Sequence, residues 1–435
     1  MTGPEPIGQV TDSWSRVHPL SPVVRAGRAV VGLLTIAGVN SASQHQPPWD
    51  ALGLAVVAIV AGVVYWRVTR WRIQGGELQI DTGLLRRQQI RVPLTQIQGV
   101  DLVRPLVARM FGVAEVRVVL ASHGAAPARL AYIAEERAVS VRARLLAIAH
   151  GLDADVPAPP ERPIIAVPPS RIIAAGLASA RFGFGIVFLV SGIVVGIAAP
   201  QVIAPAFTTF FLLLALTLVA TGRQVSAEWD FRVAEAPDGL RLESGLLQHR
   251  AETVPYGRIQ AVRWVEPLLW RPFGWVRLEF DVARQRSAER GDRQSAATTK
   301  ALFPVGSREE ARWLLARVLP GATGELPVSC GVPAPALLRI PLARRYARMQ
   351  HDATYLSCST GRVRPSVVIM PLAKIQSVRW VQGPWSRKLN LASVYVDTAG
   401  HRYTGSAAFR GVDEAQQLVA TLPGLARDAR RAARA

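Results

Sequence analysis

The chain contains three copies of one segment, and this repetition constrains its fold more than any other feature of the sequence. The copies begin at Gly83, Gly245 and Gly361 and align with one another without a gap. The residues they share are Pro93, Pro255 and Pro371; Ile97-Gln98, Ile259-Gln260 and Ile375-Gln376; Val100, Val262 and Val378; and Arg109, Arg271 and Arg387. Because one register recurs three times, we expect three modules of similar structure.

The residues within each copy alternate as they do in β-strands. Between Trp275 and Ala283 the apolar side chains alternate with Arg277, Glu279 and Asp281, which is typical of a strand with one buried and one solvated face. Turn residues such as Gly75-Gly76 separate the predicted strands. The pattern predicts a small antiparallel sheet or barrel in each module.

A helix is predicted at the end of each copy. The helical segments are Glu135 to Ala149, Ser307 to Leu319 and Val412 to Leu422. The second begins with Ser307, and Glu310 follows three residues later, which is the spacing of a capping box. Each module is therefore expected to contain six or seven strands and one closing helix.

The apolar segments of the chain predict membrane spans. Half of the residues are hydrophobic, the mean hydropathy is +0.21, and a span needs about 20 largely apolar residues. The predicted spans are Ala26 to Ser43, Ala51 to Trp66, Phe182 to Ala199 and Val202 to Thr221. Helices buried in a protein core are the alternative interpretation of these segments.

Arginines predict the orientation of these spans. They flank the outer ends of both predicted hairpins, whereas the turns at 44–50 and 200–205 contain no Lys or Arg. By the positive-inside rule, the termini and the modules are then cytoplasmic. The expected location is the cell membrane, as a multi-pass protein with four spans.

The charge of the chain points to an anionic partner. Lys and Arg number 51 against 31 acidic residues, a net charge of +20. The inner leaflet of a bilayer explains this charge, so anionic lipids are expected partners and nucleic acid is not. The segment 425–435 places four arginines at helical spacing, either as a solvated helix end or as a contact with anionic lipid.

No motif of an enzyme is present. The seven histidines have no zinc-binding spacing, and neither a phosphate-binding loop nor a nucleophile elbow occurs. Two cysteines are too few for a disulfide framework and indicate a reducing compartment. We therefore expect no catalytic residue, no metal and no cofactor.

These motifs together resemble the bacterial membrane-flanked domain, also called the bacterial PH-like domain, in its multi-copy YdbT-like form. The resemblance rests on a membrane hairpin, a Gly-Leu-Leu, a Pro-x-x-x-Ile-Gln-x-Val and an Arg-x-Phe-Gly turn before a strand, and it covers the chain from Arg25 to Gly424. It implies a PH-like fold, a bent antiparallel barrel capped by a helix, and a role that is not enzymatic. In the Arg-x-Phe-Gly turn the glycine permits a tight or left-handed turn, and Phe111 and Phe273 are expected to plug the end of the barrel beneath it. Copy three departs from the family pattern, because Leu389 and Asn390 replace Phe and Gly.

The expected fold class is thus an α+β membrane protein with two transmembrane helical hairpins and three PH-like antiparallel β-barrel modules, each closed by a C-terminal helix. The predicted segments are a transmembrane hairpin at 26–66, a first module at 67–150, a Pro-rich linker at 151–170, a second hairpin at 182–221, a second module at 223–320, a third at 340–424 and a basic tail at 425–435.

Two sets of residues are candidates for contact with a partner. The repeated arginine, Arg109, Arg271 and Arg387, suits a phosphate or lipid headgroup and equally a salt bridge within each module. An aromatic and basic cluster suits the headgroup zone of a membrane or a protein interface. Its members are Arg263, Trp264, Trp270, Arg379, Trp380 and Trp385.

The expected function is a membrane-anchored, non-enzymatic scaffold whose modules bind partner proteins or anionic lipid headgroups. The alternative is an auxiliary subunit of a membrane transport or export complex. A membrane or cytoplasmic protein partner is expected in either case, and oligomerisation stays open.

Overall fold

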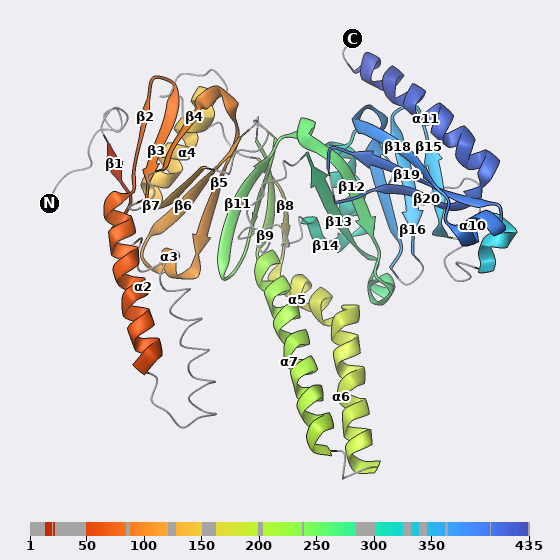
Figure 1. Ribbon diagram of the computed structural model, residues 1–435, viewed down its shortest axis with the longest axis horizontal. Helices are drawn as coiled ribbons and strands as arrows, with labels where there is room; N and C mark the ends of the chain where they lie inside the picture. Colours follow the sequence, from red (N-terminus) through yellow and green to blue (C-terminus); the bar gives the residue numbers. More distant parts are fainter. Residues whose placement is uncertain are drawn as a thin grey trace. The chain divides into compact units, whose positions relative to one another are not determined.

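The computed structural model describes residues 14–19, 21, 49–83, 88–120, 128–149, 162–198, 203–236, 239–283, 301–322, 324, 332–338, 346–361, 364–400 and 402–433. The chain divides into two compact units (Figure 1). Unit 1 contains Met1–Arg162 and Leu246–Thr253, and unit 2 contains Pro163–Gly245 and Val254–Ala435.

Unit 1 is built from the first repeat and one strand of the second. Its strands have the orders β1-β2-β3-β4, a four-stranded sheet, and β7-β6-β5-β11, which is part of a seven-stranded sheet. The elements are β1 (Ser15–Arg16), α2 (Trp49–Val68), β2 (Arg70–Gln74), β3 (Glu77–Thr82), β4 (Gln88–Pro93), β5 (Ile97–Pro105), α3 (Leu106–Met110), β6 (Val113–Leu120), β7 (Ala128–Ala134), α4 (Glu135–Ala149) and β11 (Gln248–Val254). Leu78, Val100, Val116 and Leu145 are fully buried in its core, where the sheets meet α4.

Unit 2 holds the rest of the second repeat and the whole third repeat. A six-stranded sheet with the order β14-β13-β12-β17-β16-β15 joins these repeats, and β18-β19-β20 forms a separate sheet. The strands are β8 (Arg162–Val167), β9 (Phe231–Ala236), β10 (Gly239–Ser244), β12 (Ile259–Val265), β13 (Trp275–Val282), β14 (Ala301–Ser307), β15 (Arg348–His351), β16 (Tyr355–Thr360), β17 (Ser366–Pro371), β18 (Ile375–Val381), β19 (Leu391–Thr398) and β20 (Gly405–Gly411).

The helices of unit 2 are of two kinds. Figure 1 shows α6 and α7 side by side, while α11 lies across the sheet of the third repeat. The helices are α5 (Pro169–Leu177), α6 (Ala180–Ala198), α7 (Ile203–Glu228), η5 (Leu268–Phe273), α9 (Arg308–Val318), α10 (Pro384–Lys388) and α11 (Val412–Ala432). The buried side of α11 packs on the core of the third repeat, which includes Val394 and Leu422.

The strands and closing helices lie where the sequence predicted them. Each repeat contributes six described strands followed by a helix, α4, α9 or α11. The capping box is also confirmed, because the Ser307 hydroxyl accepts the N–H of Glu310 and the Glu310 carboxylate accepts the N–H of Ser307. Helix α11 continues to Ala432 and so includes the described part of the basic tail.

The predicted barrels are wrong, because the described strands form four open antiparallel sheets and none closes into a barrel. The physical reason is where the strands find their partners. Strand β5 pairs with β11 of the second repeat, and β12 pairs with β17 of the third repeat. A strand that pairs with the next repeat cannot close the sheet of its own repeat.

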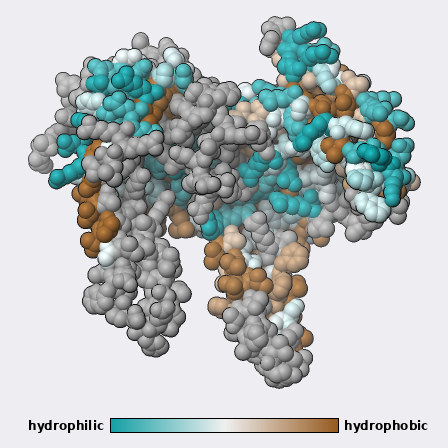
Figure 2. Space-filling view, viewed as in Figure 1, coloured by the Kyte–Doolittle hydropathy of each residue, from teal (hydrophilic) through white to brown (hydrophobic). Residues whose placement is uncertain are grey.

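The four-span prediction, and with it the multi-pass location in the cell membrane, is also wrong. Among the described residues, no single helix is both long and apolar enough to cross a bilayer. One pair of described helical segments, Pro169–Leu177 and Phe182–Val194, together reach that length and apolarity, and they are bent by 46° at the break between them. The first predicted span, Ala26 to Ser43, lies outside the described residues. Figure 2 shows that hydrophobic residues gather along α6 and α7.

The turn that precedes β6, β13 and β19 has the same backbone conformation in all three repeats. Gly112 and Gly274 both have φ of 63°, and Asn390 has φ of 50° at the matching position of the third repeat. Asn tolerates this left-handed conformation better than other residues with a Cβ atom. The predicted left-handed turn is thus confirmed and is kept without glycine. Phe111 and Phe273, predicted to plug a barrel, are exposed instead.

Replacing Asn390 tests this turn. Asn390→Val is expected to lower the free energy of unfolding of unit 2 by about 1–2 kcal/mol, because a β-branched residue is strained at positive φ. Asn390→Gly is expected to be neutral or slightly stabilising. Hydrogen exchange of the β19 amides in the full chain measures both variants, and an equal loss in the two would show that the Asn side chain, not the backbone, is what matters.

Candidate functional site

Two pairs of strands from neighbouring repeats are joined in the same register. Val103 of β5 lies opposite Arg250 of β11, and Val265 of β12 lies opposite Ser366 of β17. Val103 and Val265 occupy one position of the repeat, and Arg250 and Ser366 occupy another. In both places, therefore, a strand of one repeat pairs in the same way with a strand of the repeat before it.

The matching strand of the third repeat, β18, has no such cover. It is the outermost strand of the sheet β18-β19-β20 in the described part of the chain. Strands β12 and β18 have the sequences Ile-Gln-Ala-Val-Arg-Trp-Val and Ile-Gln-Ser-Val-Arg-Trp-Val, which differ at one residue. Yet Trp264 is 3% exposed and Trp380 is 41% exposed, while Val265 is 0% and Val381 46% exposed. The same apolar residues are buried where a further strand pairs and uncovered where none does.

The backbone of β18 has hydrogen-bonding groups directed at this open edge. In the covered pairs, the N–H of Leu106 donates to the carbonyl of Leu247 at 2.7 Å, and that of Glu266 donates to Pro365 at 2.9 Å. Such groups recur at every second residue of an antiparallel strand. The matching groups belong to Val378, Trp380 and Gln382, the residue after the strand. An unpaired row of this kind is a template for a further strand.

One face of β18 borders a hollow of about 190 Å³ beneath α11. Ile375 and Val378 line it from the strand, and Arg427 and Arg430 line it from the helix. The guanidinium of Arg430 donates to the carbonyl of Ile375 at 2.9 Å. The strand side of the hollow thus carries two apolar residues beside Gln376 and Ser377, and the helix side adds two basic residues.

The opposite face of β18 carries Arg379. Its guanidinium donates to the carboxylate of Asp397 at 2.9 Å and lies over the ring of Tyr395, 5.5 Å from the ring centroid. Trp385 is 66% exposed in the following helix α10. Arg379, Trp380 and Trp385, which the sequence analysis named, thus belong to or directly follow the uncovered edge.

The structure separates the other members of the predicted aromatic and basic cluster from this edge. Trp264 is buried, and its indole N–H donates to Glu266 at 2.9 Å. Trp270 is also buried, with its N–H donating to the carbonyl of Ala175 at 3.1 Å. Arg263 donates to the Ser366 hydroxyl at 3.2 Å. Arg263 thus bonds to the third repeat, whereas Trp264 and Trp270 lie in the core that contains the second repeat.

The repeated arginine lies in the short helix that follows each of the matching strands. Arg109 is in α3, where it donates to the carbonyl of Leu246 at 3.2 Å. Arg271 is partly buried in η5, and Arg387 is exposed in α10. Their contact with a phosphate or an acidic partner stays a prediction.

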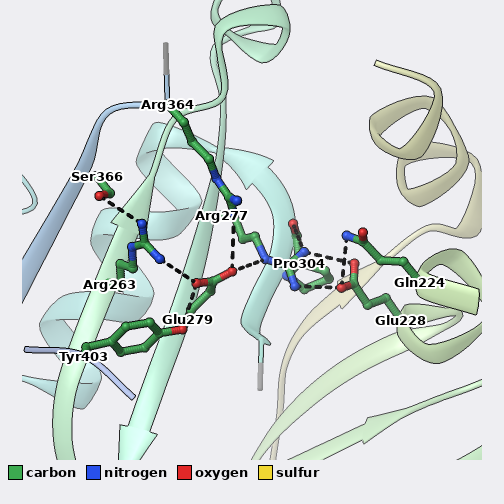
Figure 3. Close-up of polar contacts among 9 residues, drawn as sticks. All are labelled: Gln224, Glu228, Arg263, Arg277, Glu279, Pro304, Arg364, Ser366 and Tyr403. Carbon is green, nitrogen blue, oxygen red and sulfur yellow. Dashed lines mark hydrogen bonds and ion pairs between the residues drawn. The ribbon is translucent and has the colours of Figure 1, made fainter. Parts of the chain in front are cut away.

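A buried ionic network on β13 was missed by the sequence analysis (Figure 3). Arg277 donates to both carboxylate oxygens of Glu228, at 2.6 and 3.1 Å, and to Glu279 at 2.9 Å. Arg277, Glu279 and Asp281 are 3%, 4% and 4% exposed. The strand was predicted correctly, but its charged face is covered by the end of α7 and by the third repeat.

The third repeat supplies several partners of this network. The Tyr403 hydroxyl donates to Glu279 at 2.7 Å, and the backbone N–H groups of Arg402 and Tyr403 donate to Asp281 at 2.9 and 3.2 Å. Arg364 comes within 3.7 Å of Glu279. Because the carboxylates of Glu279 and Asp281 accept these bonds, the second and third repeats are fixed to one another by charge-assisted, directional hydrogen bonds.

Electrostatic attraction between Arg277 and the neighbouring carboxylates shifts the pKa values of Arg277 and Glu279. Burial alone lowers the pKa of Arg277, but the adjacent carboxylates of Glu228 and Glu279 outweigh it and raise that pKa. Burial likewise raises the pKa of Glu279, yet Arg277, the Tyr403 hydroxyl and two further arginines lower it overall. Both groups therefore stay charged in the folded protein over the neutral range.

Fold and edge together define a protein of three repeated sheet-and-helix domains in which β18 is an uncovered edge strand in the described part of the chain. The family model for the bacterial PH domain matches the chain three times, at residues 29–149, 173–322 and 311–425. The chain therefore belongs to the bacterial PH domain family, and such domains suggest binding of protein or lipid. No curated protein matches the chain.

Proposed function

We propose that this protein is a non-enzymatic binding protein that takes up an extended segment of a partner protein as an additional strand at β18. One observation carries the proposal. Strands β12 and β18 have nearly the same sequence, and β12 is covered by β17 while β18 is covered by nothing in the described residues. Addition of a strand to an open sheet edge is a recurring mode of peptide recognition.

The chemistry of the edge favours a protein segment over a lipid headgroup. The alternating N–H and C=O groups of Val378 and Trp380 are satisfied together by another backbone, whereas a phosphate accepts hydrogen bonds and cannot donate to the carbonyls. Trp380 and Val381 add apolar area that an incoming strand covers. Each fully buried side chain of this size stabilises the complex by about 1.5–3 kcal/mol.

A peptide copied from the chain itself tests the proposal. The probe is a fluorescein-labelled, amidated peptide with the sequence of residues 365–371, Pro-Ser-Val-Val-Ile-Met-Pro, which contains β17, the natural cover of β12. Added to the full chain, it is expected to bind and to slow hydrogen exchange in 375–382. Fluorescence anisotropy measures the affinity, and hydrogen exchange measured by mass spectrometry identifies the residues that the peptide protects.

Two variants of the full chain make this experiment specific. Trp380→Lys is expected to weaken binding at least about tenfold, because it removes the uncovered ring and places a charge that opposes strand addition. Trp313→Lys is the matched control, since Trp313 is 50% exposed on α9 and away from β18. Protection outside 375–382, equal effects of the two variants, or binding only to anionic vesicles would each reject strand addition at β18.

A further inference from the structure

The strands that cover β5 and β12 insert two alternate side chains toward the repeat they cover. From β11 these are Ala251, which is buried in the core of unit 1, and Thr253. From β17 they are Val367 and Ile369, which are buried in the core of the second repeat. Small or β-branched residues thus fill the space beside the covered strand in both cases.

The closing helix takes part in this recognition in unit 1. Arg142 of α4 is buried, and its guanidinium donates to the carbonyl of Val100 at 3.1 Å and to the hydroxyl of Thr253 at 2.9 Å. The helix therefore contacts both the covered strand and the strand that covers it. An arginine of the closing helix is used to recognise the second inserted side chain.

The hollow beside β18 occupies the corresponding place in the third repeat. In the register of the two covered pairs, residues matching Val367 and Ile369 would lie opposite Trp380 and Val378. Val378 lines the hollow, and Pro423 and Ala426 close it from α11. The side chain opposite Val378 would enter this space, and the alternate one opposite Trp380 would lie beside that exposed indole.

The basic rim of the hollow favours an acidic side chain at the next position of the incoming strand. An antiparallel strand that runs past Val378 next reaches Gln376, where the pairing of β18 with β19 is irregular between Ile375 and Ser377. Gln376 and Arg427 line the hollow there. Within the described part of the chain, the side chain of Arg427 has no hydrogen bond or ion pair. A carboxylate at this third position would meet that guanidinium.

We propose that the segment bound at β18 has the pattern apolar-x-apolar-x-acidic, with small or β-branched apolar residues opposite Trp380 and Val378 and a carboxylate facing Arg427. This inference rests on the proposed function and specifies its ligand. The occupant is a different protein and not a second copy offering β4. In the shared register, β4 would place the polar Gln89 and Arg91 in the two apolar positions and Pro93 in the acidic position.

Three amidated peptides added to the full chain test the pattern. The first is Pro-Ser-Val-Val-Ile-Met-Pro, the second ends in Glu in place of the last Pro, and the third has Lys in place of the first Val and the Ile. The Glu peptide is expected to bind about tenfold more tightly than the first, which is the gain expected of one added charge-assisted hydrogen bond. The Lys peptide is expected not to bind.

Substitution of Arg427, at the rim of the hollow, tests whether this residue causes the tighter binding of the Glu peptide. Arg427→Gln is expected to remove the tenfold preference for Glu, so that the first two peptides bind with equal affinity. Arg431→Gln is the matched control on the same helix, because Arg431 already faces Asp428 at 3.6 Å. It is expected to keep the preference.

The outcomes separate this inference from the proposed function. Equal affinity of the first two peptides, with protection still at 375–382, overturns the acidic position and leaves strand addition standing. Absence of binding by all three overturns both. Concentration-dependent dimers of the free chain that Trp380→Lys abolishes overturn the identification of a foreign partner in favour of a second copy. Retained preference in Arg427→Gln rejects Arg427 as its source.

Discussion

Replacing Arg277 with Met is expected to lower the free energy of unfolding of unit 2 by about 3–5 kcal/mol. This is the loss typical of breaking a buried ion pair from one side, since the remaining charges keep their burial cost without a partner. Here two carboxylates, Glu228 and Glu279, would be left facing each other with side-chain exposures of 9% and 5%. Denaturant unfolding of the full chain, followed by hydrogen exchange in β13, measures the effect.

An exposed ion pair of similar length provides the control for Arg277. Arg232 donates to Asp230 at 2.9 Å, but the two side chains are 61% and 45% exposed. Arg232→Met is expected to change stability by about 0–1 kcal/mol, because water competes for both groups. If the two variants lost equal stability, burial would not be the source of the effect.

Glu279→Gln is expected to cost about 1.5–3 kcal/mol at pH 7, the range for hydrogen bonds to charged groups. The cost should depend on pH. The folded pKa of Glu279 is lowered, so its contribution is fully present above the unfolded pKa, about 4.3 for Glu, and is lost as the pH falls through the folded value. The wild-type chain and the variant should therefore converge in stability in acid.

Unfolding curves of both chains between pH 7 and pH 3 measure this convergence. Asp397→Asn serves as the control, because Asp397 pairs with Arg379 at the surface, where the side chains are 30% and 60% exposed. It is expected to cost little at pH 7. A difference between wild type and Glu279→Gln that stays constant down to pH 3 would contradict the assignment to the carboxylate.

Local sequence pattern was sufficient to predict the elements of each repeat. The period-two alternation gave β13, the Ser307 and Glu310 spacing gave the start of α9, and the glycine before the strand gave a left-handed turn. These features depend on residues a few positions apart. The same reasoning could not say which face of β13 is solvated, because Glu228 and Tyr403 cover it from distant parts of the chain.

The candidate site shows the same limit more sharply. Trp264 and Trp380 have nearly identical sequence neighbours, so no local rule distinguishes the buried ring from the exposed one. The difference lies in whether a later repeat supplies a strand. The predicted barrels were wrong for that reason too, since a period-two pattern does not specify which strand is the partner. The apolar segments gave the helices α6 and α7 but not the length and straightness of a span.

Because each repeat is covered by the next, the number of open strand edges does not depend on the number of repeats. Every added repeat would bury the edge of the repeat before it and open one of its own. A chain built in this way has a single acceptor edge of this type, whatever the number of its repeats. Loss of the last repeat would not abolish that edge but would transfer it to β12, whose sequence is nearly the same. A change in the number of repeats would then change the domains attached to the open strand, while the sequence of that strand would stay almost the same.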